Sequence, residues 1–191
     1  MSIPKIAYIL TPVGFGGAEK VNLNYLLNVD RTKYDITPIL LIRPWEEESI
    51  FINRVKCANY KYHTVPVAVR SPADGSDPIR VVRCFKIIYS LLKRGNFDLI
   101  HTHGYFADIV GIPAARVSGI PCISTCHGHI GNDNKLRLYN MLDRVALRFS
   151  GRVIAVSDTI KDYLVSHGVK ESRIHIIANA VLTEINEENN I

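Results

Sequence analysis

The sequence predicts an α/β fold, a doubly wound and mainly parallel sheet of about seven strands with helices on both faces. Apolar runs alternate with amphipathic helical stretches along the chain, which is the order that βα units produce. Several runs, such as 153–156, are apolar throughout, as strands covered on both faces require. A glycine-rich turn at 14–17 joins the first apolar run to the first helical stretch.

Hydrophobic periodicity and turn residues place the elements in order. Strands are predicted near residues 5–11, 36–42, 60–65, 98–102, 121–125, 152–156 and 173–177. Helices are predicted near residues 17–29, 46–56, 78–93, 105–118, 135–149 and 158–167. Asp77 and Ser157 are typical of helix starts, and Gly95, Gly119 and Gly168 are typical of helix ends.

Length and composition predict one domain with a substantial core. The chain has 191 residues, of which 47% are hydrophobic and 21% charged. We assign 1–181 to this domain and 182–191, which is acidic and polar, to a linker or tail. No apolar run reaches the roughly 18 residues that span a bilayer, and the first residues lack a signal-peptide pattern. We therefore expect a cytoplasmic protein.

Charge and cysteine content exclude some classes of partner. The net charge of +5 is mild, and no basic run with interleaved aromatics or DNA-binding spacing occurs, so we expect no nucleic-acid partner. The four cysteines lie mostly in apolar segments, which favours reduced, buried thiols. Cys122, Cys126, His127 and His129 are residue types that bind zinc, but their spacing fits no compact zinc site, and we expect no metal.

The turn at Gly14, Gly16 and Gly17 is predicted to bind a phosphate or diphosphate. Glycine permits a positive φ and close approach of a ligand, and the first turn of the following helix has N–H donors without intrahelical partners. A dinucleotide fingerprint would need a small residue at position 19 and an acidic residue after the second strand. The chain has Glu19 and Arg43 there, so we expect no NAD. The alternative is that the glycines only tighten the turn.

Polar residues follow several strands at the edge where open parallel sheets bind ligands. His101, His103 and Tyr105 come at or after the end of the fourth strand, His127 after the fifth and Ser157 after the sixth. We expect His101 and His103 to point to opposite faces, one packing inward and the other reaching the rim. Local hydrogen bonding, or helix capping by Ser157, is the alternative to a binding role.

Five segments, in this order, resemble the N-terminal domain of the GT-B glycosyltransferases of family 4. They are GGAE at 16–19, DLIHTH at 98–103, TCHG at 125–128, VIAVS at 153–157 and RIHIIAN at 173–179. The resemblance covers nearly the whole chain and implies a Rossmann-like domain. The family's Pro-Asn-Gly-Val is Ala178-Asn-Ala-Val181 here, so Ala180 replaces a glycine at the expected crossing to a second domain.

The resemblance implies a retaining transferase that moves a sugar from a UDP- or GDP-sugar to a glycan, lipid-linked or small-molecule acceptor without a cofactor. In the family a C-terminal domain holds most of the donor, and this chain does not contain it. We therefore expect the chain alone to be inactive. The alternative is a non-catalytic Rossmann-like module that binds a nucleotide or phosphorylated ligand.

The same resemblance assigns roles to individual residues. It implies that Gly16 and Gly17 contact the donor diphosphate and that His127 is catalytic, lying near the anomeric carbon of the donor sugar. The leaving phosphate, rather than His127, is expected to take the acceptor proton. Residues expected on the acceptor side are Glu19, His103, Tyr105 and Ser157.

The helix predicted at 135–149 has a basic side and an apolar side. The basic side carries Arg137, Arg144 and Arg148, and the apolar side carries Tyr139, Leu142, Val145, Ala146 and Phe149. A solvated basic face is the simplest interpretation. Peripheral contact with the cytoplasmic face of a membrane is the alternative, since the resemblance includes enzymes that act on lipid-linked sugars.

Overall fold

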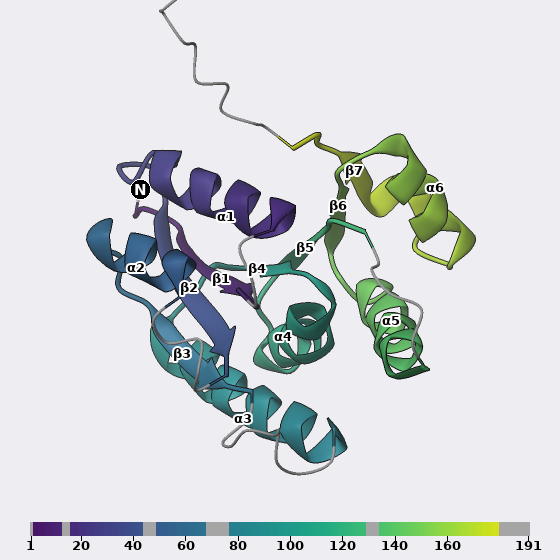
Figure 1. Cartoon of the computed structure of the whole chain (residues 1–191), viewed down its shortest axis with the longest axis horizontal. Coiled ribbons are helices and arrows are strands. Elements are labelled where there is room, and N and C mark those ends of the chain that lie inside the picture. The colour runs from purple at the N-terminus through teal and green to yellow at the C-terminus, as the bar shows by residue number, and fades with distance from the viewer. Residues whose placement is uncertain (1, 13–15, 44–48, 68–76, 129–133, 180–191) are drawn as a thin grey trace, which may run out of the picture.

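The computed structural model describes residues 2–12, 16–43, 49–67, 77–128 and 134–179. In this part of the chain seven parallel strands form one sheet in the order β3-β2-β1-β4-β5-β6-β7 (Figure 1). The predicted α/β, doubly wound sheet is therefore confirmed. The strands are β1 (Lys5–Leu10), β2 (Asp35–Ile42), β3 (His63–Pro66), β4 (Leu99–His103), β5 (Cys122–Cys126), β6 (Arg152–Ala155) and β7 (Ile174–Ile176).

The helices alternate with these strands as predicted, and their ends use the expected residues. Ser157 accepts a hydrogen bond from the Ile160 N–H at the start of α6, and Gly119 ends α4 in the left-handed conformation with a φ of 72°. The helices are α1 (Gly17–Asn28), α2 (Ile50–Cys57), α3 (Asp77–Gly95), α4 (Tyr105–Ser118), α5 (Asn134–Leu147) and α6 (Asp158–Ser166), with a short 3₁₀ turn at Glu171–Arg173.

One strand begins later than predicted. Periodicity placed the third strand at 60–65, whereas β3 begins at His63. Tyr60 is instead buried in the connection after α2, where its N–H donates to the carbonyl of Val55. The strand period cannot distinguish such a buried connection from a strand. The predicted tail at 182–191 and the domain boundary at 181 lie outside the described residues.

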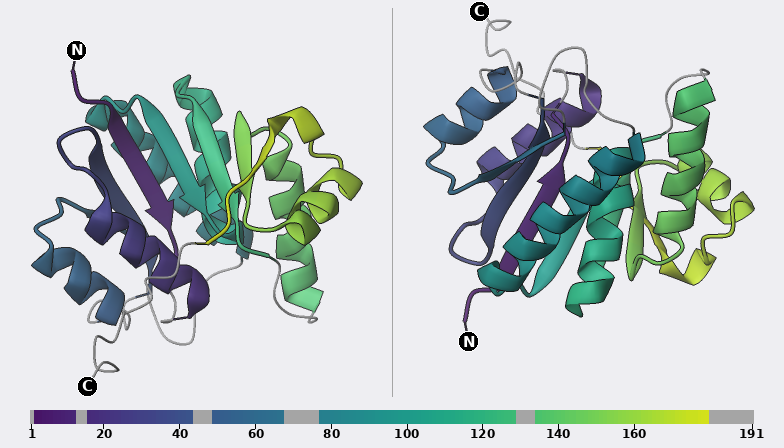
Figure 2. Two further views of the ribbon diagram at one scale, coloured as in Figure 1. Left: turned by 90° about the horizontal axis from the view of Figure 1, so that it is seen from above. Right: turned by 90° about the horizontal axis from the view of Figure 1, so that it is seen from below.

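The helices form two layers around the sheet. α1 and α2 cover one face over β1–β3, and α3, α4 and α5 cover the opposite face (Figure 2). Strand residues alternate between these layers: Ile6, Tyr8 and Leu10 pack toward α1 and α2, while Ala7 and Ile9 pack toward α3 and α4. No helix of the described residues is both long and apolar enough to span a membrane.

The α1 face of the sheet is open over β4–β7 in the described part of the chain (Figure 2). Ile123 of β5 and Ile154 of β6 point to this face and are only half-buried. Ile177, after β7, is 56% exposed on the same side. This open half of the face lies beside α1 and forms the floor of the site described next.

Candidate functional site

The candidate site lies where the order of the sheet reverses, between β1 and β4. α1 leaves β1 toward one face and α4 leaves β4 toward the other, which opens a crevice at the carboxyl ends of the strands. In the register of the sheet, Leu10 of β1 lies beside His103 of β4, and His103 lies beside Thr125 of β5. The histidines predicted at this edge are therefore brought together.

The described glycines of the turn do not have the positive φ that the sequence analysis associated with them. Gly16 is extended, with a φ of −82°, and Gly17 is the first residue of α1, so neither needs a positive φ. Only Gly16 has a close neighbour that a side chain would crowd. A Cβ at Gly16 would lie 3.1 Å from the Oε2 atom of Glu19, and a Cβ at Gly17 would face open space. Gly14 lies outside the described residues.

The carboxylate of Glu19 lies at the start of α1. Its Oε2 atom accepts a hydrogen bond of 3.1 Å from the Gly16 N–H, and its carboxylate lies at the positive end of the α1 dipole. The N–H groups of Gly17 and Ala18 in the first turn have no intrahelical partner. The helix start thus presents free amides, with an internal carboxylate beside them.

The three histidines of the rim form one cluster. The ring centroids of His101 and His103 are 4.0 Å apart, and the His103 Nδ1 atom lies 3.5 Å from the Nε2 atom of His127. The expectation that His101 and His103 point to opposite faces was wrong, because residues two positions apart on a strand share a face. Both rings pack against Tyr8 of β1, and His101 also hydrogen-bonds the Thr125 hydroxyl at 2.8 Å.

Burial keeps these imidazoles uncharged. Desolvation lowers the pKa of His101 to about 3, and it lowers the pKa of His103 well below its ordinary 6.5. Neighbouring histidines add to both shifts. Burial also lowers the pKa of His127, although the carboxylate of Glu19 acts in the opposite direction. The cluster is therefore neutral at pH 7, and each ring has one donor and one acceptor nitrogen.

Two nitrogens of the cluster lack a hydrogen-bond partner among the described residues. They are Nε2 of His103 and Nδ1 of His127, and both are buried. Since the two neutral rings face each other through their inner nitrogens, one outer nitrogen is a donor and the other an acceptor. An unsatisfied buried polar atom is costly. Because the inner nitrogens face each other, the two outer nitrogens lie on the far sides of the rings, and each needs a partner of its own, such as a water or a hydroxyl.

The cluster lies at one end of a trough of about 620 Å³ between α1 and the open sheet face. Tyr8 supports the trough from below: its hydroxyl donates to Asn22 at 2.7 Å, and its ring stacks on Tyr25 at 5.5 Å. Gly16 and Gly17 do not line the trough and lie at the N-terminal end of the same helix. The other lining residues are mostly apolar, among them Ile6, Leu99, Ile123, Ile154, Val156 and Ile177.

Two predicted acceptor-side residues have local structural partners. The Ser157 hydroxyl caps α6, as the alternative interpretation anticipated. Tyr105, at the start of α4, is 39% exposed, and its ring packs on Tyr139 of α5 at 5.8 Å. Within the described part of the chain, neither Ser157 nor Tyr105 makes a hydrogen bond or ring contact with the histidine cluster, so their acceptor roles stay predictions.

A buried carboxyl group behind the cluster escaped the sequence analysis. Asp108 of α4 accepts hydrogen bonds from the hydroxyls of Thr102 and Ser124, which tie α4 to β4 and β5. Desolvation, reinforced by Asp143, raises the pKa of Asp108 well above its usual range. Burial likewise raises the pKa of Asp143 to about 7. An aspartate among the apolar residues of a predicted helix was the signal available in the sequence.

Among the described residues, no group of three His, Cys, Asp or Glu side chains is arranged to hold a metal ion. Cys122 and Cys126 are buried on the α4 side of β5, and desolvation raises the pKa of each thiol to about 12. Protonated thiols of this kind are poor metal ligands. The expectation that the protein needs no metal or other cofactor stays a prediction.

Two curated relatives match about half of the chain. A UDP-Gal:alpha-D-GlcNAc-diphosphoundecaprenol alpha-1,3-galactosyltransferase of Escherichia coli is 31% identical over 100 residues, which are 49% of this chain and 26% of that protein. The GPI3 subunit of phosphatidylinositol N-acetylglucosaminyltransferase of Saccharomyces cerevisiae (strain YJM789) is 32% identical over 108 residues, which are 54% of this chain and 24% of that subunit.

A solved structure shares the fold. HepE of Anabaena, crystallised in complex with UDP, superposes with a TM-score of 0.66 at 16% identity, covering 93% of this chain and 44% of HepE. The chain therefore spans less than half the length of this similar protein. Residues 15–185 match the sequence profile of Glycosyltransferase Family 4, which is nearly the whole chain. The ordered segments, the seven-stranded parallel sheet and this match agree, and the chain belongs to glycosyltransferase family 4.

Proposed function

We propose that this chain is the acceptor-side, N-terminal domain of a retaining glycosyltransferase. The transferase class follows from the family. The proposed donor is a UDP- or GDP-sugar, and the proposed acceptor is a lipid-linked glycan. Two relatives support this acceptor class, since their names specify a diphosphoundecaprenol-linked sugar and phosphatidylinositol.

The observation that carries the proposal is that two residues lining the trough, His103 and His127, each have one buried ring nitrogen without a hydrogen-bond partner among the described residues. Sugar hydroxyls both donate and accept hydrogen bonds, so they match one donor and one acceptor nitrogen. Being neutral at pH 7, the rings position the sugar without placing a cation beside its electron-poor anomeric carbon. His127 is the proposed residue nearest the reacting carbon.

The start of α1 is the proposed site for the donor diphosphate. The free N–H groups of Gly17 and Ala18 and the positive helix end would stabilise the charge that grows on the leaving phosphate. Glu19 must then move or share the site, because its carboxylate already accepts from the Gly16 N–H. We propose that donor binding displaces this carboxylate toward His127, to which it is electrostatically coupled.

A second domain is proposed to complete the site. The chain covers 44% of HepE, and it offers a half-open trough with an apolar floor rather than a closed pocket. One wall of this kind leaves the reacting centre in contact with water. The chain alone is therefore proposed to have little or no transferase activity.

The proposal is tested in the full-length protein that contains this chain. His127→Ala should lower kcat/KM with nucleotide-sugar and acceptor by about 10²-fold to 10³-fold, the usual range for loss of one positioned polar group. The matched control is His175→Ala, which removes an exposed histidine of β7 and should change kcat/KM little. Equal rates for His127→Ala and the unmutated enzyme would contradict the proposed role.

Thermal-shift screening of this chain and the full-length protein separates the alternatives. Stabilisation of the full-length protein by one nucleotide-sugar, with transfer only in that protein, supports the enzyme. If the chain alone binds a nucleotide and the full-length protein transfers no sugar, the non-catalytic binding module is correct.

A further inference from the structure

Two aspartates lie buried between α4 and α5, on the face of the sheet opposite the trough. Asp108 of α4 is 1% exposed and Asp143 of α5 is 2% exposed. Their carboxyl groups are hydrogen-bonded to each other. Such a bond needs a proton on one of the two groups, because two ionised carboxylates have no donor and repel each other. The two aspartates therefore share a proton, and we call them the carboxyl pair.

The hydroxyls around Asp108 indicate where that proton lies. Thr102 of β4 and Ser124 of β5 both donate to the Oδ1 atom of Asp108. Since Oδ1 already accepts two hydrogen bonds, Oδ2 is the oxygen left to carry a proton and donate it to Asp143. Asp108 is therefore the carboxyl group that keeps its proton longer, and Asp143 is the one that ionises first.

Asp108 bridges the two strands that end in the histidine cluster. In the register of the sheet Thr102 lies beside Ser124, so one carboxyl oxygen joins facing residues of β4 and β5. The next residue of β4 is His103, and His127 directly follows β5. The bridge thus lies close behind the edge where the rings of these two histidines come within 3.5 Å of each other.

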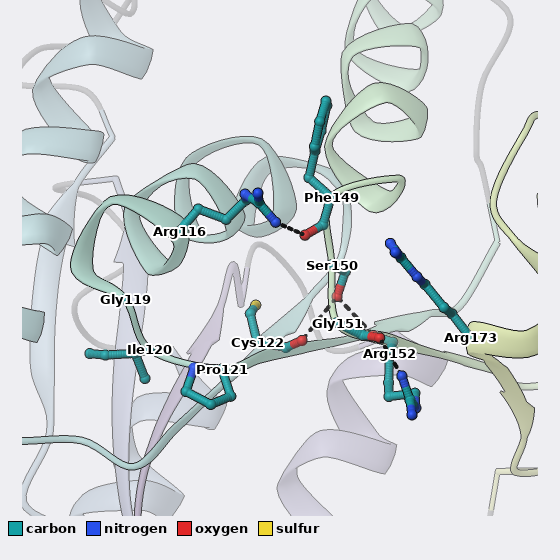
Figure 3. A pocket seen from close by; sticks show the side chains of 10 residues that line it. All are labelled: Arg116, Gly119, Ile120, Pro121, Cys122, Phe149, Ser150, Gly151, Arg152 and Arg173. Carbon is teal, nitrogen blue, oxygen red and sulfur yellow. Dashed lines mark hydrogen bonds between the residues drawn. The ribbon is translucent and has the colours of Figure 1, made fainter.

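Asp143 extends the bridge to α5, a helix whose C-terminal end is attached separately. Ser150, in the turn after α5, donates to the carbonyl of Cys122 at the start of β5 (Figure 3). Arg116 of α4 donates to the carbonyl of Phe149 in the same turn (Figure 3). Asp143 comes about two helical turns before Ser150. The carboxyl pair is therefore a second point at which α5 is attached to α4 and the sheet.

Other ionisable side chains surround the carboxyl pair. On α5, the cation of Arg144 favours the ionised form of Asp143. On β5, the thiols of Cys122 and Cys126 are buried, and burial raises the pKa of each to about 12, so they stay uncharged. Arg80 of α3, the helix that packs on α4, is also buried. Burial nevertheless outweighs Arg144 and raises the pKa of Asp143 to about 7.

We propose that the proton shared by the carboxyl pair holds β4, β5 and α5 together and thereby fixes the gap between His103 and His127. Asp108 and Asp143 are positioning residues, since neither lines the trough. Loss of the last proton at alkaline pH places two carboxylates side by side, and their repulsion loosens the three elements. Only the effect on sugar transfer rests on the proposed function.

The shared proton is tested by NMR titration of the 191-residue chain with carbon-13 in its aspartate carboxyl groups. Asp143→Asn removes a like charge and supplies an N–H donor, so the pKa of Asp108 should fall. Asp108→Asn keeps a donor and should leave the pKa of Asp143 near 7, whereas Asp108→Ala removes the donor and should raise it. Asp162→Asn, on the exposed side of α6, is the control. An unchanged Asp108 titration in Asp143→Asn would overturn the proposal.

The positioning role is tested on the ring-proton NMR signals of His103 and His127 in the same chain. Asp108→Ala removes the hydrogen bonds to both strands and to Asp143, so these signals should move. The amide of Asp108→Asn can replace all of these bonds, and the signals should stay near their original positions. Ser124→Ala removes only the bond to β5 and should shift the His127 signal even if Asp108→Ala does not fold. Circular dichroism checks the fold of each variant.

In the full-length protein, Asp108→Ala should lower kcat by about tenfold or more with little change in KM, because small misplacements of positioned groups slow the reaction. Asp108→Asn should restore most of the rate and weaken its fall at alkaline pH, since its pair cannot become doubly charged. Histidine signals that stay in place in Ser124→Ala and Asp108→Ala would overturn the positioning role. Lack of transfer by the unmutated full-length protein would instead refute the proposed function and leave both NMR tests valid.

Discussion

At the scale of single residues, the start of α1 binds its own carboxylate. Glu19 accepts from the Gly16 N–H and is the charged group that raises the pKa of His127 against the effect of burial. The proposed donor-phosphate site and His127 are therefore linked through one side chain. The sequence analysis placed Glu19 among the acceptor-side residues by resemblance, but its link to His127 required the fold.

This link predicts a pKa change at His127. Glu19→Gln removes a negative charge that favours the imidazolium, so the pKa of His127 should fall further below its ordinary value. The measurement is an NMR pH titration of the histidine ring protons, with His127→Ala to assign the signal. Glu171→Gln removes an exposed carboxylate that pairs with Lys161 and serves as the control. An unchanged His127 titration in Glu19→Gln would contradict the coupling.

The buried aspartates predict how stability varies with pH. The folded-state pKa of Asp143 is about 7, against an ordinary value of 3.8, because burial penalises its charge. Between these values the folded chain retains a proton that the unfolded chain releases, so this group makes stability fall as the pH rises from about 4 to about 7.

Asp143→Asn should therefore flatten the fall in stability over this range, and it should raise the stability near pH 8 relative to pH 5. Urea unfolding at several pH values measures the effect. Asp162→Asn, on the exposed side of α6, is the control and should keep the original slope. A slope that Asp143→Asn leaves unchanged would show that Asp143 does not carry the proton.

At the scale of elements, α4 is the helix that holds the site in place. The carboxyl group of Asp108 accepts hydrogen bonds from Thr102 of β4 and Ser124 of β5. Gly111 of the same helix packs closely against Thr102. Thr102 lies between His101 and His103 on β4 and points to the opposite face. A shift of α4 would therefore move the strand that carries the histidine cluster.

Gly111→Ala tests this packing. The new Cβ would lie 2.7 Å from the Cγ2 atom of Thr102, so the substitution should destabilise the chain by about 1–3 kcal/mol despite the better helix propensity of alanine. At Gly17, also helical, a Cβ meets nothing within 4 Å, and Gly17→Ala should change the free energy of unfolding by no more than about 0.5 kcal/mol. Urea unfolding compares the two variants, and equal stability would refute the close packing of α4 on β4.

The elements themselves were largely predictable from sequence. The helix at 105–118 was placed as observed, and Gly95, Gly119 and Gly168 lie at or just past helix ends as expected. These features depend on residues close together in the chain. Which residues on the apolar side of α5 are buried was not predictable, because helical periodicity shows on which side of a helix a residue lies and not whether another element covers it.

At the scale of the whole molecule, the fold determines which thiols react. Cys84, Cys122 and Cys126 are buried, and burial raises their pKa values to between about 11 and 12, whereas Cys57 is exposed. A thiol reagent at pH 8 should therefore modify one cysteine rapidly in the native chain and all four in urea. Cys57→Ser should abolish the rapid phase, and its persistence in that variant would show that a core thiol is accessible.

The sequence by itself determined the α/β class, the order of the elements and the edge of the sheet where polar residues gather. The carboxyl ends of parallel strands lie at the same edge of a sheet. Residues that directly follow the strands therefore share this edge in any strand order. Only the tertiary structure decided that His103 meets His127 and that Asp108 meets Ser124. These contacts depend on strand register and helix placement, which are set by packing among residues far apart in the chain.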